Sequence, residues 1–273
     1  MLFDLVKKHS INITIAVIII FVIVIIALLI CVGQGIPLVP PIKTLPKVKR
    51  TNIDPNQVQI YMVSTPHIGN YSNHSIAINR EYALKHGYRF RVFTTNGTPQ
   101  LPINFGKIQN ALDLMKGVDP PEYVVHIDAD AVVVKKEYPI TAIIDAYMGG
   151  NISLLIGEDC YNDSHCSKPG RINSGVFIVK NNALGRKILE KWLDGARGGC
   201  KRYVNQFPNC QLVFWHCVMM SYLRPYIKVA PYNLLNGTDG LFIQHLMQHS
   251  TNDRIEHFKK IGMGQGTVRT PVY

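Results

Sequence analysis

The stretch YVVHIDADAVVV, residues 123–134, places two aspartates inside what otherwise has the pattern of a buried strand. Residues 123–127 are apolar enough for a central strand, and the residues after the aspartates are apolar again. Burying an unpaired carboxylate is very costly, so Asp128 and Asp130 need a partner. Because side chains alternate along a strand, we expect both carboxylates to point to the same side, where the strand leaves its sheet.

The partner that the two carboxylates predict is a cation. Like charges that share a site repel each other unless a cation lies between them. The hard ions Mn²⁺ and Mg²⁺ take oxygen ligands and are commonly shared with substrate phosphates. The stretch therefore predicts a metal–diphosphate site, and the alternative is a pair of loop carboxylates that cap a turn.

The rest of the chain alternates between short β-rich runs and runs of helical periodicity. This alternation predicts one α/β domain over 57–273, with a mostly parallel sheet flanked by helices, whose ligands bind at the carboxyl ends of the strands. The expected strands are 57–65, 88–95, 122–134, 152–159 and 174–181, with strand-like runs at 226–236 and 240–248. The expected helices are 75–87, 105–117, 140–148, 183–196 and 210–223.

The N-terminus predicts a membrane anchor. Residues 15–32 are apolar without a charge, and as a helix they would reach roughly 27 Å, close to the hydrocarbon core of a bilayer. Lys7 and Lys8 favour a cytoplasmic tail at 1–14, although basic residues also follow the span. We expect an uncleaved signal-anchor, a proline-rich stem at 33–56 and a type II membrane protein; a cleaved signal peptide is the alternative.

Sequons and cysteines favour the lumen of the secretory pathway. N-x-S/T triplets begin at Asn12, Asn70, Asn73, Asn96, Asn151, Asn162 and Asn236. The spacings of Cys160 with Cys166 and of Cys200 with Cys210 suit two local disulfides, and metal binding is the alternative. Cys31 and Cys217 are expected to be free.

The chain is basic, with 29 lysines and arginines against 18 aspartates and glutamates. This excess of positive charge favours an anionic partner, such as a phosphorylated ligand, an acidic glycan or a membrane surface. The alternative is a basic soluble protein without such a partner. The basic residues are scattered and form no patch interleaved with aromatic residues, so a nucleic-acid partner is not expected.

Four segments carry a resemblance to a known family. They are NREYALKHGY (79–88), HIDADAVV (126–133), GRINSGVFIVKNN (170–182) and FIQH (242–245). In this order they resemble the galactosyl/mannosyltransferase family of GT-A-fold, nucleotide-sugar-dependent glycosyltransferases, which includes fungal Golgi α-galactosyl- and mannosyltransferases and plant xyloglucan xylosyltransferases. The resemblance covers about residues 57–260. It implies a Golgi type II membrane protein that retains anomeric configuration and needs Mn²⁺, with Mg²⁺ as the alternative.

The resemblance also implies a metal site and a donor site. Asp128 would face the ribose and the metal, Asp130 would bind the metal, and His245 would complete the site. His249 is the fallback for His245 and His257 the third choice, while the structural alternative is a satisfied core histidine. The remaining donor-binding residues would be Ser64, Thr65, Lys107 and Gly175. Lys107 would meet the base or a phosphate, or else be a solvated helix lysine.

On the sugar and acceptor side, the resemblance implies catalytic roles for Asp159, Asn173 and Gln211. The family usually carries an acidic residue before this glutamine, whereas Cys210 stands there in this chain. An alternative alignment puts Trp215 and His216 at the same place. The expected substrates are a nucleotide sugar (UDP-galactose, UDP-xylose, UDP-glucose or GDP-mannose) and a glycan hydroxyl. A catalytically inactive sugar- or nucleotide-binding relative is the alternative function.

Overall fold

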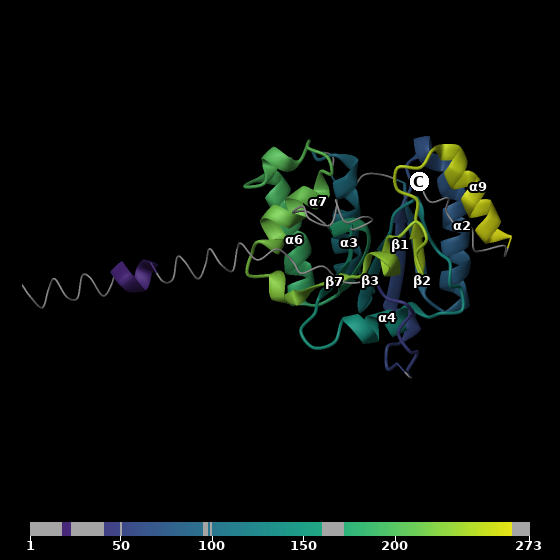
Figure 1. Ribbon diagram of the computed structural model, residues 1–273, viewed down its shortest axis with the longest axis horizontal. Coiled ribbons are helices and arrows are strands. Elements are labelled where there is room, and N and C mark those ends of the chain that lie inside the picture. The colour runs from purple at the N-terminus through teal and green to yellow at the C-terminus, as the bar shows by residue number, and fades with distance from the viewer. Residues whose placement is uncertain are drawn as a thin grey trace, which may run out of the picture. The chain divides into compact units, whose positions relative to one another are not determined.

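The computed structural model describes residues 18–22, 41–49, 51–94, 98, 100–159 and 172–263 (Figure 1). The chain divides into two compact units, 1–38 and 39–273. Residues 18–22 of the first unit are helical, and within the described part of the chain no helix is long and apolar enough to cross a membrane. The expected span at 15–32 lies mostly outside the described residues and stays a prediction, as do the tail and the Cys160–Cys166 disulfide.

The second unit is built on a six-stranded sheet in the order β2-β1-β3-β6-β5-β7. β6 is antiparallel to both of its neighbours, and the other pairings are parallel, as the alternation of strands and helices predicted. The strands are β1 (Val58–Val63), β2 (Arg89–Phe93), β3 (Tyr123–Ile127), β5 (Leu154–Glu158), β6 (Ile172–Lys180) and β7 (Ile227–Ala230).

The expected long strand at 122–134 is interrupted at the two aspartates. β3 ends at Ile127, and a turn closed by the hydrogen bond from the Ala131 N–H to the Asp128 carbonyl, 3.0 Å, leads into β4 (Ala131–Val133). β4 pairs in a separate antiparallel sheet with β8 (Ile243–His245), where Ala131 lies opposite His245. The two carboxylates come together as expected, but strand alternation is the wrong reason, because residues 128–130 form a turn and the turn sets their directions.

Helices cover both faces of the large sheet (Figure 1). α2 (Gly69–Lys85) packs against α9 (Thr251–Gly262), and α3 (Gly106–Met115) packs against α6 (Ala183–Arg197). The other helices among the described residues of this unit are α4 (Ile140–Tyr147), α7 (Cys210–Val213), which continues as a π-helix over Phe214–Met219, and α8 (Tyr232–Leu235). Short 3₁₀ turns lie at Pro55–Gln57, Pro66–Ile68, Ile103–Phe105, Lys201–Tyr203 and Arg224–Tyr226.

Two strand-like runs differ from expectation. Residues 226–236 form β7 and then α8, because Pro231 directly after the strand starts a helix with its fixed φ. In 240–248 only β8 is extended. α9, which the sequence reading did not predict, begins with a capping box formed by Ser250 and Asp253.

Alternation along β1 separates the two halves of the core. Val58, Ile60 and Met62 are fully buried in one cluster with residues of α2 and α4. The intervening Tyr61 faces the other way, and its hydroxyl donates to the Lys107 carbonyl in α3, 2.6 Å. Part of the predicted stem joins the first cluster, since Ile42, Leu45 and Ile53 pack against it.

Polar side chains of α2 hold the turn between β3 and β4. The Ser75 hydroxyl donates to the Ala129 carbonyl, 2.6 Å. The Asn79 carboxamide donates to the Ala131 carbonyl and accepts from the Val133 N–H, both at 2.9 Å. Because these partners are buried, the backbone that carries the two aspartates is fixed from the helix side.

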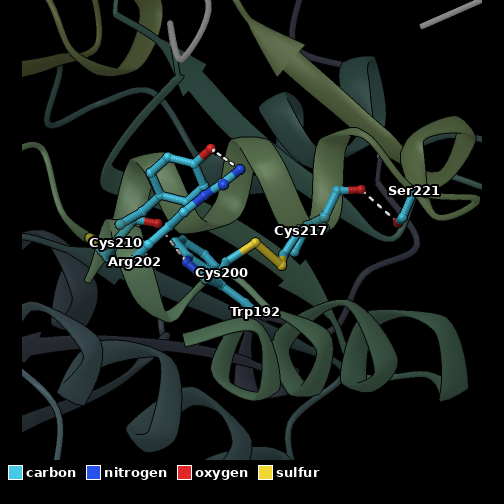
Figure 2. Close-up of a disulfide and its surroundings, with 8 residues drawn as sticks. Trp192, Cys200, Arg202, Cys210, Cys217 and Ser221 are labelled. Carbon is cyan, nitrogen blue, oxygen red and sulfur yellow. Dashed lines mark hydrogen bonds between the residues drawn. A yellow bond between two sulfur atoms is a disulfide. The ribbon is translucent and has the colours of Figure 1, made fainter. Parts of the chain in front are cut away.

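The disulfide near α6 differs from the predicted one (Figure 2). Cys200 pairs with Cys217 on the π-helix, with 6.2 Å between their Cα atoms, so the predicted Cys200–Cys210 bond is wrong and Cys217 is not free. Gly195 leaves room for this bond, because a Cβ there would lie 2.9 Å from the Cys217 sulfur. The free Cys210 is buried, and its sulfur lies 3.3 Å from the Ser174 hydroxyl.

Candidate active site

The three predicted metal ligands meet at one edge of the sheet. One ligand atom from each of Asp128, Asp130 and His245 lies within 4.8 Å of the others. The two aspartates follow the carboxyl end of β3, and the pairing of β4 with β8 brings the histidine beside them. The fallback histidines lie elsewhere: His249 contacts the Met247 carbonyl, and His257 contacts the Gln244 carboxamide.

Asp128 is held by two groups on the α3 side of the sheet. The Lys107 amine lies 3.1 Å from both carboxylate oxygens, and His126 Nε2 lies 2.7 Å from Oδ1. Burial opposes ionisation of Asp128, but Lys107, His126 and His245 together hold the pKa of the carboxyl well below its usual range. Burial lowers the pKa of His126 to about 4, so this ring is neutral at pH 7 and donates to Asp128.

Lys107 is therefore not the solvated helix lysine that the sequence left open. Its side chain is only 8% exposed. Burial lowers the pKa of Lys107, but Asp128, with added contributions from Cys210 and Asp130, outweighs burial and leaves the pKa above its usual value. The lysine thus carries a buried positive charge next to the first aspartate.

Asp130 is held from the opposite side, by β8 and α9. His245 Nε2 lies 3.0 Å from Oδ1, and an Arg254 guanidinium nitrogen lies 3.0 Å from Oδ2. Arg254 also donates to the Leu246 carbonyl, 3.1 Å, and lies 4.9 Å from the centre of the Tyr71 ring. Burial lowers the pKa of His245, but Asp130 and Asp128 together outweigh burial, and the pKa lies above its usual value.

The donor set of this cluster fits a divalent cation. Two carboxylates and one imidazole are ligands that Mn²⁺ accepts, whereas Mg²⁺ prefers oxygen alone. Lys107 lies beside Asp128, and Arg254 and His245 lie beside Asp130, so each carboxylate has at least one positively charged or hydrogen-bonding partner. A cation bound by His245 Nε2 and Asp130 would take the place of the proton that they share.

The three residues predicted to be catalytic also come together. The Asn173 amide donates to Asp159 Oδ1, 3.2 Å, and the Gln211 amide donates to Asp159 Oδ2, 3.4 Å. Gln211 also accepts from the Ser174 N–H, 3.3 Å. Gln211 thus lies with Asp159 and Asn173, whereas His216, from the alternative alignment, stacks on Tyr203.

Backbone contacts connect this polar group to the aspartates. The Asp128 N–H donates to the Gly175 carbonyl, 2.7 Å, and the Gly175 N–H donates to Asn173 Oδ1, 2.7 Å. A Cβ at Gly175 would lie 2.1 Å from His245 Cε1. Glycine is therefore required where β6 passes the metal-ligand cluster.

Ser64 and Thr65 lie at the carboxyl end of β1, as predicted, and line a cavity of about 520 Å³. The cavity extends between β2 and the α2 residues from Gly69 to Arg80. Ser64 also bonds to Ser72 of α2, 2.7 Å. The cavity thus lies at the carboxyl ends of β1 and β2, which run parallel with β3, although the aspartates themselves do not line it.

Arg254 and His126 are partners of the aspartates that the sequence did not predict. His126 precedes Asp128 by two residues, so strand alternation could have suggested a contact. Arg254 lies 124 residues from Asp130, and no local pattern indicates their ion pair.

Comparisons with known proteins agree with this architecture, although no protein-family model matches the chain. An alpha-1,2-galactosyltransferase of Schizosaccharomyces pombe is 22% identical over 212 residues, 66% of this chain and 53% of that protein. The chain thus spans about half the length of this curated relative.

Among solved structures, a glycosyltransferase involved in glycosylation of the major capsid of PBCV-1 aligns with a TM-score of 0.59 and 20% identity, over 74% of this chain and 98% of that one. The galactosyltransferase LgtC aligns more weakly, with a TM-score of 0.46 and 14% identity over 77% of this chain and 97% of LgtC. The fold is that of a GT-A glycosyltransferase, which confirms the fold expected from the resemblance. The similar proteins, in sequence and in fold, are glycosyltransferases.

Proposed function

We propose that this chain is a metal-dependent, retaining glycosyltransferase. It would move a hexosyl or pentosyl unit from a nucleoside-diphosphate sugar to a hydroxyl group of a glycan. The observation that carries the proposal is the convergence of Asp128, Asp130 and His245 at the carboxyl edge of a GT-A sheet. The galactosyltransferase activity of the Schizosaccharomyces pombe relative supports the same reaction class.

Asp128, Asp130 and His245 would hold Mn²⁺, or Mg²⁺ as the alternative. When bound, such an ion neutralises charge that builds up on the departing diphosphate. The buried amine of Lys107 adds a fixed positive charge beside Asp128 and so favours an anionic donor at the same place. The cavity next to Ser64 and Thr65 offers space for the nucleoside.

Asp159, Asn173 and Gln211 would bind the donor sugar and orient the acceptor. Their amides and carboxylate are held together by hydrogen bonds, and such groups suit sugar hydroxyls. In the proposed reaction the bond from the anomeric carbon to the diphosphate breaks and a bond to the acceptor oxygen forms on the same face. The acceptor proton passes to the diphosphate oxygen that leaves.

We also propose that the chain is a type II membrane protein of the Golgi or another secretory-pathway lumen. Two sequon asparagines, Asn70 and Asn151, are exposed on the domain, where a glycan could be attached, whereas the exposed Asn73 lines the cavity proposed for the nucleoside. The Cys200–Cys217 disulfide also suits an oxidising compartment.

A donor screen tests the activity. The purified chain is incubated with Mn²⁺ and UDP-galactose, UDP-xylose, UDP-glucose or GDP-mannose, and hydrolysis and transfer are measured with and without a chelator. We expect turnover of one donor that stops when the metal is removed. No turnover of any of the four donors would favour a catalytically inactive sugar- or nucleotide-binding relative.

A further inference from the structure

Asn236 begins a glycosylation triplet, yet it is fully buried. It follows α8, and its side chain reaches into the domain instead of solvent. The Asn236 amide nitrogen donates to the Glu158 carbonyl at the end of β5, 3.4 Å. Its amide oxygen lies 3.4 Å from Nδ1 of His245. The carboxamide therefore bridges the main sheet and the histidine of the metal-ligand cluster.

Two glycines leave the space that this arrangement needs. A Cβ at Gly157 in β5 would lie 1.6 Å from the Asn236 amide nitrogen. A Cβ at Gly175 in β6 would lie 2.1 Å from the His245 ring. Real side chains do not approach so closely, so the carboxamide and the imidazole each occupy a position that only glycine permits. Thus β5, at Gly157, packs against the Asn236 carboxamide, and β6, at Gly175, packs against the His245 ring.

The two ring nitrogens of His245 face different kinds of acceptor. Nε2 faces Asp130, at 3.0 Å, and Nδ1 faces the Asn236 amide oxygen. An amide oxygen only accepts hydrogen bonds, so it keeps a proton on Nδ1. A histidine that binds a metal commonly donates its other N–H to such a group, which fixes the ring and its tautomer.

We propose that Asn236 is a positioning residue for His245 and is not a glycan acceptor. It orients the imidazole so that Nε2 points at the site of Asp128 and Asp130. This inference rests on the proposed metal site. It predicts that the sequon beginning at Asn236 stays unmodified in the folded chain, because a glycan on the amide nitrogen would require the asparagine to leave its buried position.

Three variants of the full-length chain test the role through Mn²⁺ binding measured by calorimetry. Asn236→Leu keeps the branched shape and the number of side-chain heavy atoms but removes the acceptor, and we expect the Kd for Mn²⁺ to rise about 10- to 100-fold. Asn236→Asp keeps an acceptor for Nδ1, and its Kd should stay within about threefold of wild type, since carboxylates commonly fill this role. Unchanged Mn²⁺ affinity in folded Asn236→Leu would overturn the proposal.

Asn233→Leu is the matched control. Asn233 lies in α8, three residues earlier, and makes two hydrogen bonds to the backbone of Ile42, at 3.0 and 2.6 Å. Loss of these two hydrogen bonds in Asn233→Leu should lower the melting temperature without changing the Kd for Mn²⁺. An equal loss of Mn²⁺ affinity in Asn233→Leu would show that damage to α8, and not the contact with His245, causes the effect.

A metal-independent measurement separates this inference from the proposed function. In ¹⁵N-histidine-labelled protein, the Nδ1 proton of His245 should be hydrogen-bonded and slow to exchange in wild type and in Asn233→Leu, and should exchange rapidly in Asn236→Leu. The same Nδ1 signal in all three proteins would overturn the inference. A wild-type chain that fails to bind Mn²⁺ but shows the expected Nδ1 pattern would contradict the metal site alone.

Peptide mapping of protein made in a secreting eukaryotic host completes the test. We expect no glycan on Asn236 in the folded fraction. Folded protein that carries a glycan on Asn236 and still binds Mn²⁺ with wild-type affinity would overturn the proposal.

Discussion

Replacing Gly175 with alanine should displace His245 and so weaken metal binding. The added Cβ would lie 2.1 Å from His245 Cε1, 2.7 Å from its Nδ1 and 2.9 Å from Asn173 Oδ1. Carbon atoms in contact lie about 3.5–4.0 Å apart, so the ring must move by roughly 1.4 Å or more. Since His245 is buried between Asp130 and Asn236, it has little room for this shift.

Both stability and metal affinity should respond to Gly175→Ala. Overpacking of a buried site costs about 1–3 kcal/mol of unfolding free energy, which urea titration followed by circular dichroism can measure. A displacement of the ring of this size should raise the Kd for Mn²⁺ by an order of magnitude or more, measured by calorimetry.

Gly149→Ala serves as the control, because a Cβ at Gly149 would meet no atom within 4 Å. It should leave the unfolding free energy and the Mn²⁺ affinity close to wild type. If Gly175→Ala also kept both wild-type values, the close approach of β6 to His245 would be refuted.

Two further predictions concern residues around the site. Replacing both Cys200 and Cys217 with serine removes a disulfide between residues 17 apart in the sequence. The unfolding free energy, measured by urea titration, should therefore fall by about 3 kcal/mol. An unchanged urea midpoint would contradict the Cys200–Cys217 pairing. Arg254→Met removes a cation bound to Asp130 Oδ2, so the affinity for Mn²⁺ should rise about tenfold by calorimetry while the melting temperature falls. A weaker Mn²⁺ affinity in stably folded Arg254→Met would show that the arginine supports Asp130 instead of competing with a metal.

Most individual helices and strands were predicted well, because each has its own hydrophobic periodicity within a short stretch of sequence. The runs around β1, β2, α3 and α6 have clear periodicity, and the structure places these elements within a few residues of expectation. The long strand at 122–134 was wrong at its centre because apolar residues on both sides of Asp128 and Asp130 hid the turn. That turn depends on Ser75 and Asn79, which lie more than 50 residues earlier in the chain.

The part of the candidate site that lies in recognisable sequence motifs was predictable. Asp128, Asp130 and His245 were predicted as a set, and they converge. Their supporting contacts were not predictable, because Arg254 and Asn236 meet the cluster only through the packing of α9 and the loop after α8. The Cys200–Cys210 prediction failed for a similar reason, since the π-helix that carries Cys217 packs against α6.

The most direct test of the account compares Mn²⁺-dependent turnover of the preferred nucleotide sugar by wild type and Asp130→Ala. We expect Asp130→Ala to abolish both Mn²⁺ binding and transfer, while the circular dichroism spectrum and cooperative unfolding show that the chain is still folded. Undiminished Mn²⁺-dependent turnover by Asp130→Ala would contradict the assignment of the metal site.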